Sequence, residues 1–261
     1  MSPNTCTATM GSEVLEQQLV FLLETKMYKR ILEFMYNMSW DELTGISKIL
    51  STNIEASRPL NPPNLSALLS MPHDNMASPP LGFTALEVSK DGNCFFHSIA
   101  LLLTGEHDNS SLFRLGASLH GINHLDHYLD TIYCGLGENL SDLMSWISSF
   151  TARGITSDLD TSNPKEMLRV ALQNECMETL LDGAYSGVFQ NLIMAGWLQA
   201  SIQPHLSLGT VQVHNEVYAQ ALPPCSCYTG TRRELHILWT TADPTCQTLN
   251  HIVPLLPTNG I

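Results

Sequence analysis

Apolar positions at helical spacing dominate the N-terminal part of the chain. Leucine, isoleucine and methionine recur at intervals of three and four between residues 12 and 38, which predicts one long helix. Ser39 and Glu42 form the serine-to-glutamate pattern of a capping box, so a second helix is expected to begin there and to continue through Leu50. Residues 1–11 show no such pattern and are expected to be disordered. The two helices predict a helical hairpin.

Six prolines interrupt the pattern between residues 58 and 80, which predicts a linker with one helical turn at residues 65–70. Helices predominate in the middle of the remaining chain and strands come late, an order that predicts an α+β fold with a small mixed sheet flanked by helices. The expected division is a helical extension (1–58), a proline-rich linker (59–82) and one domain (83–261). The expected helices are 111–130, 140–150, one starting at 163–164, and 188–200; the expected strands are 84–88, 202–208, 211–219 and 235–240.

A candidate nucleophile stands at a strand-turn-helix junction. The turn-forming triplet Asp91, Gly92 and Asn93 leads directly into Cys94, which opens an apolar segment of helical period. The dipole and free N–H groups of a helix N-terminus favour negative charge, so we expect a lowered thiol pKa at Cys94. Gly92 and Asn93 are expected to shape a loop whose backbone N–H groups meet a developing oxyanion.

A thiolate nucleophile needs a general base from elsewhere in the fold. His251 starts a short apolar run of strand character and follows another strand, residues 235–240. A histidine at the mouth of such a hairpin can face a helix N-terminus, as a cysteine–histidine pair requires. His97, one turn into the helix of Cys94, is expected to be structural.

The sequence from Asp91 to Ile99, Asp-Gly-Asn-Cys-Phe-Phe-His-Ser-Ile, resembles the cysteine box of the ovarian-tumour (OTU) family of papain-like thiol proteases. The stretch around Asn250 and His251 resembles the histidine box of that family, and the resemblance covers roughly residues 83–257. It implies a papain-like OTU fold and a cysteine-type deubiquitinase, which removes ubiquitin or a ubiquitin-like modifier from lysines without a cofactor. In that mechanism Cys94 is the nucleophile and His251 the base.

One position departs from the family pattern. Many OTU proteases carry Asp or Asn two residues after the histidine to orient the imidazole, whereas this chain has Val253. Asp91, Asn250, a group from elsewhere or no group remain the alternatives for this third role. The departure also supports a rival function, a catalytically weak or inactive OTU-like module that binds ubiquitin or acts as a scaffold. A general peptide protease is a more distant third option.

Composition limits the classes of binding partner and the cellular compartments that we expect for this protein. The chain carries 25 acidic and 12 basic residues, a formal net charge of −13. Its basic residues do not cluster beyond residues 26–30 and the pair Arg232 and Arg233, which argues against nucleic acid as a partner. The acidic balance suits the basic surface that the resemblance implies for ubiquitin. No apolar run approaches the roughly 20 residues of a membrane span. Seven cysteines without a secretion signal predict reduced thiols in the cytoplasm or nucleus.

Two groups of possible metal ligands give weak signals. His120, His124 and His127 share one helical face, but a zinc site needs further ligands and only Asp126 lies nearby in the sequence. The cysteines of residues 225–227 are too close together for the usual two-residue spacing of zinc ligands. We therefore predict neither a metal nor a cofactor.

Overall fold

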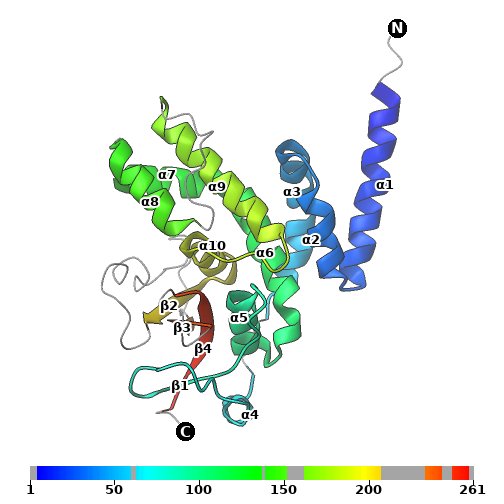
Figure 1. Ribbon diagram of the computed structural model, residues 1–261. Helices are drawn as coiled ribbons and strands as arrows, with labels where there is room; N and C mark the ends of the chain where they lie inside the picture. Colours follow the sequence, from blue (N-terminus) through cyan, green and yellow to red (C-terminus); the bar gives the residue numbers. More distant parts are fainter. Residues whose placement is uncertain are drawn as a thin grey trace.

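The computed structural model describes residues 5–59, 63–136, 139–151, 162–206, 233–242 and 249–258. The helices are α1 (Thr5–Glu24), α2 (Tyr28–Tyr36), α3 (Trp40–Ala56), α4 (Leu65–Leu69), α5 (Cys94–Thr104), α6 (Ser110–Asn123), α7 (Leu125–Leu136), α8 (Leu140–Phe150), α9 (Pro164–Leu180) and α10 (Val188–Leu198), with a short 3₁₀ turn, η1 (His107–Asn109). The strands are β1 (Phe83–Ala85), β2 (Ala200–Leu206), β3 (Arg233–Thr240) and β4 (His251–Pro257). Figure 1 shows the sheet toward one end of the molecule and α1 projecting on the far side of the helices.

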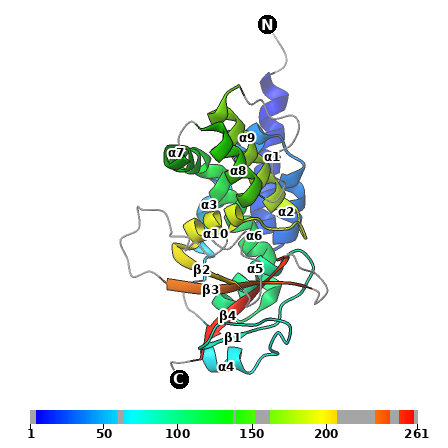
Figure 2. The same cartoon turned by 60° about the vertical axis from the view of Figure 1, so that its left-hand side comes forward.

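The four strands form one mixed sheet in the order β1-β4-β3-β2. β2 and β3 run parallel, while β4 runs antiparallel to both of its neighbours. α5 packs on the inner strand β4 and α10 packs on the edge strand β2 (Figure 2). The predicted α+β fold with a small mixed sheet is confirmed. The first residue of β4, His251, pairs with Thr240 of β3 and is buried although it directly follows a loop.

The N-terminal helices differ from the prediction in two respects. The expected single helix over residues 12–38 is two helices, because Lys26 adopts a left-handed backbone conformation with φ of 56° and ends the first one. The first helix also begins at Thr5 rather than at Ser12. The capping box is confirmed: the Ser39 side chain accepts from the Glu42 N–H, and the Glu42 carboxylate accepts from the Ser39 N–H at 2.9 Å.

Most other predicted elements are confirmed to within a few residues. The helical turn over 65–70 is α4, the helix over 140–150 is α8, and Asn163 caps α9, whose first residue is Pro164. The helix expected over 111–130 is divided into α6 and α7 at His124. The strand expected over residues 211–219 lies outside the described residues.

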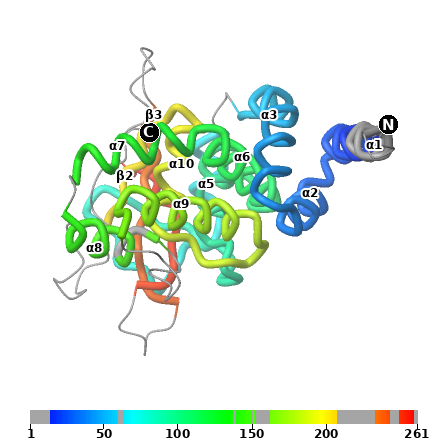
Figure 3. Tube along the Cα trace, turned by 90° about the horizontal axis from the view of Figure 1, so that it is seen from above, coloured from blue at the N-terminus to red at the C-terminus, as the bar shows by residue number. Residues whose placement is uncertain are grey.

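The helical extension shares its hydrophobic core with the rest of the chain. Buried side chains of α1 to α3 belong to the same cluster as those of α5, α6 and α10. α3 packs on α6, where Ser47 Oγ donates to Asn123 Oδ1 at 2.6 Å, and Arg58 Nη1 donates to the Trp197 carbonyl at 2.8 Å. Figure 3 shows α2 and α3 between the projecting α1 and α6. The described helices include none with both the length and the apolar character needed to cross a bilayer.

Candidate active site

Cys94 is the first residue of α5 and lies against the start of β4. Ser98, one turn further along α5, has its Oγ 2.7 Å from the Cys94 carbonyl oxygen and 3.0 Å from the Ile252 carbonyl oxygen, so the first turn of the helix is tied to β4. The structure therefore brings Cys94 to the residue that directly follows His251.

The environment of Cys94 opposes the expected lowering of its pKa. The residue is 5% exposed, and burial raises the pKa of its thiol above the ordinary value. Hydrogen bonds from the backbone of Ile252 and Phe95 favour the thiolate, but they offset burial only in part. The nearby negative charge of Asp91 adds to the upward shift. The expectation of a lowered pKa is corrected, because desolvation outweighs the helix N-terminus.

A buried carboxylate faces His251. Asp74 Oδ2 lies 3.8 Å from His251 Nε2, and the two side chains are only 4% and 1% exposed. Within the part of the chain that the structure describes, neither atom has a hydrogen-bond partner. The other carboxylate oxygen of Asp74 accepts from the N–H groups of Met76 and Ala77 at 2.8 and 3.2 Å, which holds the side chain in place. Asp74 thus stands where an orienting group for the imidazole is needed.

This geometry distinguishes the two ring nitrogens of His251. Since Nε2 faces Asp74, Nδ1 is the nitrogen that remains to accept a proton from a thiol. Burial lowers the pKa of His251, and Lys90 lowers it further, while Asp74 and Asp91 oppose the shift. The imidazole is therefore neutral near pH 7, the state in which it can accept a proton.

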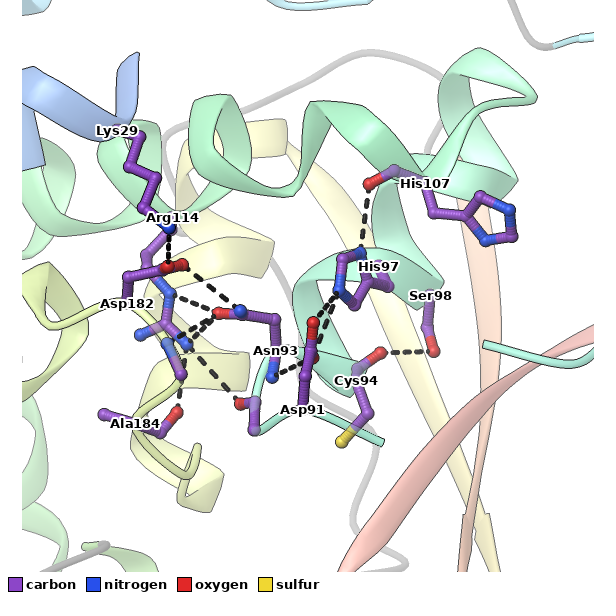
Figure 4. A network of polar contacts seen from close by, with 12 residues as sticks. Lys29, Asp91, Asn93, Cys94, His97, Ser98, His107, Arg114, Asp182 and Ala184 are labelled. Carbon is purple, nitrogen blue, oxygen red and sulfur yellow. Dashed lines mark hydrogen bonds and ion pairs between the residues drawn. The ribbon is translucent and has the colours of Figure 1, made fainter. Parts of the chain in front are cut away.

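Asp91 and Asn250 use their side chains elsewhere. The Asp91 carboxylate lies 3.0 and 3.2 Å from His97 Nε2 and accepts from the Asn93 N–H at 2.9 Å (Figure 4). Partial burial raises the pKa of Asp91, but the hydrogen bonds from His97 and Asn93 outweigh it and the pKa falls below its ordinary value. The Asn250 Oδ1 accepts from the Ala242 N–H at 2.8 Å and closes the β3–β4 connection. Asp91 and Asn250, the residues expected in the third role, thus bond elsewhere, and it is Asp74 whose carboxylate lies 3.8 Å from His251 Nε2.

Asp74 was missed because it lies in the segment interpreted as a linker. That segment pairs with the end of β1 and the residues after it: the Asp74 N–H donates to the Ala85 carbonyl at 3.1 Å, and the Glu87 N–H donates to the Pro72 carbonyl at 3.0 Å. The Leu86 N–H in turn donates to the Pro254 carbonyl of β4. Proline-rich composition indicates irregular backbone, and it carries no signal that the segment lies along the sheet.

Gly92 and Asn93 form the tight turn before the nucleophile. Gly92 has φ of +84°, and a Cβ atom there would meet the Gly183 carbonyl oxygen at 1.8 Å, so glycine is required both by conformation and by space. Asn93 is buried, and its carbonyl accepts from the His97 N–H at 2.8 Å. The His97 side chain lies between the Asp91 carboxylate and the His107 carbonyl oxygen, so it joins the loop before Cys94 to the residues after α5.

The three histidines considered as metal ligands make other contacts. His120 Nε2 lies 3.0 Å from the Tyr128 hydroxyl, and the His120 ring packs on that of His124. Burial lowers the pKa of His120 to about 3. No group of three metal-binding side chains occurs among the described residues. The cysteines of residues 225–227 lie outside them.

A comparison with protein families bears on this site. The family model described as "Vertnin, OTU domain" matches residues 85–240, more than half of the chain. The chain belongs to this OTU-domain family. The resemblance found in the cysteine box is thereby confirmed, and the matched range of the OTU domain includes Cys94 but ends before His251.

Solved OTU domains are similar to this one at low identity. The OTU domain of OTUD1 is 14% identical, with 67% of this chain and 85% of that chain covered and a TM-score of 0.39. The viral OTU domain protease from Farallon virus is 15% identical, with 68% and 86% covered and a TM-score of 0.39. Among curated proteins, no sequence matches this chain. Neither structural similarity assigns a residue or a substrate to this OTU domain.

Proposed function

We propose that this OTU domain is a cysteine-type deubiquitinase, a thiol isopeptidase that removes ubiquitin or a ubiquitin-like modifier from lysine side chains. One observation carries the proposal: Asp74 Oδ2 lies 3.8 Å from His251 Nε2, and Ser98 Oγ lies within hydrogen-bond distance of the carbonyl oxygens of both Cys94 and Ile252, the residue after His251. The side chains of Cys94, His251 and Asp74 supply a nucleophile, a base and an orienting group, the set that thiol proteases use. Membership of an OTU-domain family supports the same class of reaction.

In the proposed reaction, the Cys94 thiol gives its proton to His251 Nδ1 and the sulfur attacks the isopeptide carbonyl carbon. Backbone N–H groups of residues 91–94 other than that of Asn93, which donates to the Asp91 carboxylate, hold the oxyanion. The carbon–nitrogen bond then breaks, and the imidazolium returns its proton to the leaving lysine amine. Water, deprotonated by the same histidine, hydrolyses the thioester and regenerates the thiol. Asp74 keeps the proton of Nε2 in place and stabilises the imidazolium.

The raised pKa of Cys94 and the lowered pKa of His251 support one order of events in the proposed reaction. Both shifts favour the neutral thiol and the neutral imidazole over a preformed thiolate–imidazolium pair. The proton therefore moves as the substrate arrives, and the histidine acts as a general base in the attack itself.

The same observations favour a second candidate function, a catalytically weak OTU-like module that binds ubiquitin. Cys94 is almost fully buried and its pKa is raised, and Val253 occupies the position where many OTU proteases carry an orienting side chain. A module of this kind retains the binding surface while its thiol reacts slowly.

A ubiquitin that carries a thiol-reactive group at its C-terminus separates the two functions. The experiment compares the wild-type chain, Cys94→Ala and Cys134→Ala, the last being a matched control because Cys134 is an exposed free cysteine of α7. A covalent adduct with wild type and Cys134→Ala, absent with Cys94→Ala, supports the isopeptidase. Binding without an adduct supports the module, and neither adduct nor binding contradicts both. A panel of ubiquitin-like probes then identifies the modifier.

A further inference from the structure

A buried guanidinium group lies beneath the loop that precedes Cys94. Arg114 of α6 is 1% exposed. Its Nε and Nη2 both donate to Asn93 Oδ1, at 3.0 and 2.7 Å, and Nη2 also lies 3.5 Å from the Gly92 carbonyl oxygen. Figure 4 shows the guanidinium group pointing from α6 toward these residues. The carbon at the centre of the group lies 4.2 Å from the centre of the Phe96 ring.

Arg114 joins this loop to a second one. Its Nη1 donates to the Thr179 carbonyl at 3.1 Å, and its Nη2 donates to the Ala184 carbonyl at 2.9 Å. Both acceptors belong to the end of α9 and the turn that follows, where Gly183 packs against Gly92. A planar fork of five donors can bridge two backbones in this way, whereas a lysine ammonium cannot.

The Asn93 side chain is fully engaged inside this network. Besides the two bonds from Arg114, its Oδ1 accepts from the Gly183 N–H at 3.1 Å, and its Nδ2 donates to Asp182 at 3.2 Å. Asp182 in turn forms an ion pair with Lys29 of α2 at 2.7 Å. The Asn93 amide therefore serves to fix its own backbone, and Asn93 is the residue directly before the nucleophile.

A buried cation costs several kcal/mol of desolvation unless its hydrogen bonds are satisfied. Burial lowers the pKa of Arg114 to about 10, so the group still carries its charge at neutral pH. Apolar side chains fill core volume without this cost. The position of the guanidinium group under the Cys94 loop thus points to a role in that loop.

We propose that Arg114 is a positioning residue for Cys94: through Asn93 and Gly92 it fixes the backbone N–H groups that meet the oxyanion. This inference rests on the proposed isopeptidase function, because it assigns Arg114 a part in that reaction. Arg114 acts through the loop and does not touch the substrate. Its loss affects the transition state, where the oxyanion forms, more than substrate binding.

Arg114→Lys tests the proposal in the full chain, since it keeps the positive charge and removes the fork. Arg58→Lys is the matched control, because Arg58 also donates to a backbone carbonyl but on α10. We expect Arg114→Lys to lower kcat on a ubiquitin substrate by about 100-fold with KM unchanged, as for the loss of an oxyanion donor. Arg58→Lys should leave kcat unchanged. Wild-type kcat in Arg114→Lys, or an equal loss in both variants, overturns the proposal.

Amide hydrogen exchange gives a second measurement that needs no substrate. Arg114→Lys should speed exchange in the peptide spanning residues 91–97 while peptides of β3 and β4 keep wild-type protection. An unchanged exchange rate over 91–97 overturns the positioning role even if the wild-type chain labels with the ubiquitin probe. If the wild-type chain fails to label, the proposed function falls, and the exchange measurement still decides whether Arg114 positions the loop.

A milder variant covers the case in which Arg114→Lys does not fold. Asp182→Ala removes the acceptor of the Asn93 Nδ2 and the partner of Lys29, both at a partly exposed site. We expect a smaller loss of kcat, about tenfold, and faster exchange over residues 91–97. Wild-type kcat together with wild-type exchange in this variant contradicts the proposal.

Discussion

His251 and Asp74 lie side by side in the protein interior, with Nε2 3.8 Å from Oδ2, although most of the OTU domain separates them in the sequence. Asp74 belongs to a proline-rich segment and His251 to the central strand β4. The pair is brought together because the segment of Asp74 hydrogen-bonds to the chain after β1, which in turn hydrogen-bonds to β4. The carboxylate beside His251 thus comes from before the cysteine box and not from the residues after the histidine.

Asp74→Asn should lower kcat/KM on a ubiquitin substrate by about 100-fold or more while the fold is retained. The amide oxygen can still accept from the N–H groups of Met76 and Ala77. The amide NH₂ then faces His251 Nε2 and favours the tautomer with its proton on Nδ1, which cannot accept the thiol proton there. Steady-state kinetics measures the loss. Asp130→Asn, which removes only an exposed ion pair with Lys165, is the control. Equal activity of the Asp74 variant and wild type would show that His251 needs no such partner.

Gly92→Ala should abolish labelling of Cys94 by the ubiquitin probe and lower the melting temperature. A methyl group at this position meets the Gly183 carbonyl oxygen at 1.8 Å, and the φ of +84° is unfavourable for alanine. Gly45→Ala in α3 is the matched control, because nothing lies within 4 Å of its added Cβ and alanine favours a helix by about 1 kcal/mol. Calorimetry and probe labelling together check the pair. A stable, fully reactive Gly92→Ala would refute the tight-turn geometry.

An ordinary cysteine thiol has a pKa of about 8.5. Alkylation of Cys94 by a small reagent such as iodoacetamide should therefore reach half of its maximal rate at a pH above about 8.5. Burial raises the pKa of this thiol, and the reagent reacts with the thiolate. Mass spectrometry of the peptide that contains Cys94 isolates its rate from those of the other cysteines. A half-maximal rate well below pH 8 would instead support the thiolate expected from the helix N-terminus alone.

Stability should fall as the pH drops below about 6.5, the ordinary histidine pKa. Burial lowers the pKa of His120 to about 3 and also lowers that of His251. Below about pH 6.5 these two histidines therefore bind protons in the unfolded chain but remain neutral in the folded chain, until the pH reaches their folded-state pKa. Stability from these groups is complete above pH 6.5 and is lost progressively toward the folded-state pKa. For His120 the loss by pH 5 is about 2 kcal/mol.

Urea unfolding at pH 7 and pH 5 measures this difference in the free energy of unfolding. His120→Gln should reduce it by about the His120 share, about 2 kcal/mol, because glutamine does not titrate. His127→Gln on α7 serves as the comparison. An unchanged pH dependence of the free energy of unfolding in His120→Gln would mean that the buried histidine does not cause the loss of stability at low pH.

Local structure was predictable where a few neighbouring residues decide it. The capping box of Ser39 and Glu42 and the Asn163–Pro164 start of α9 need only contacts within one helical turn. The missed helix break at Lys26 shows the limit, since its left-handed conformation leaves no signal in a pattern of apolar positions. The residues of the cysteine box likewise identified the family, because the Asp-Gly-Asn turn and the helix of Cys94 are adjacent in the chain.

Sequence alone therefore determined the α+β class, the OTU family and the two residues proposed to react, Cys94 and His251. Tertiary structure decided which carboxylate faces His251 and that Arg114 lies beneath the cysteine loop, because both contacts join segments far apart in the chain. It also reversed the expected direction of the Cys94 pKa. A pKa depends on how completely the surrounding chain removes water from a group. The residues next to a cysteine in the sequence do not show how deeply it is buried in the fold.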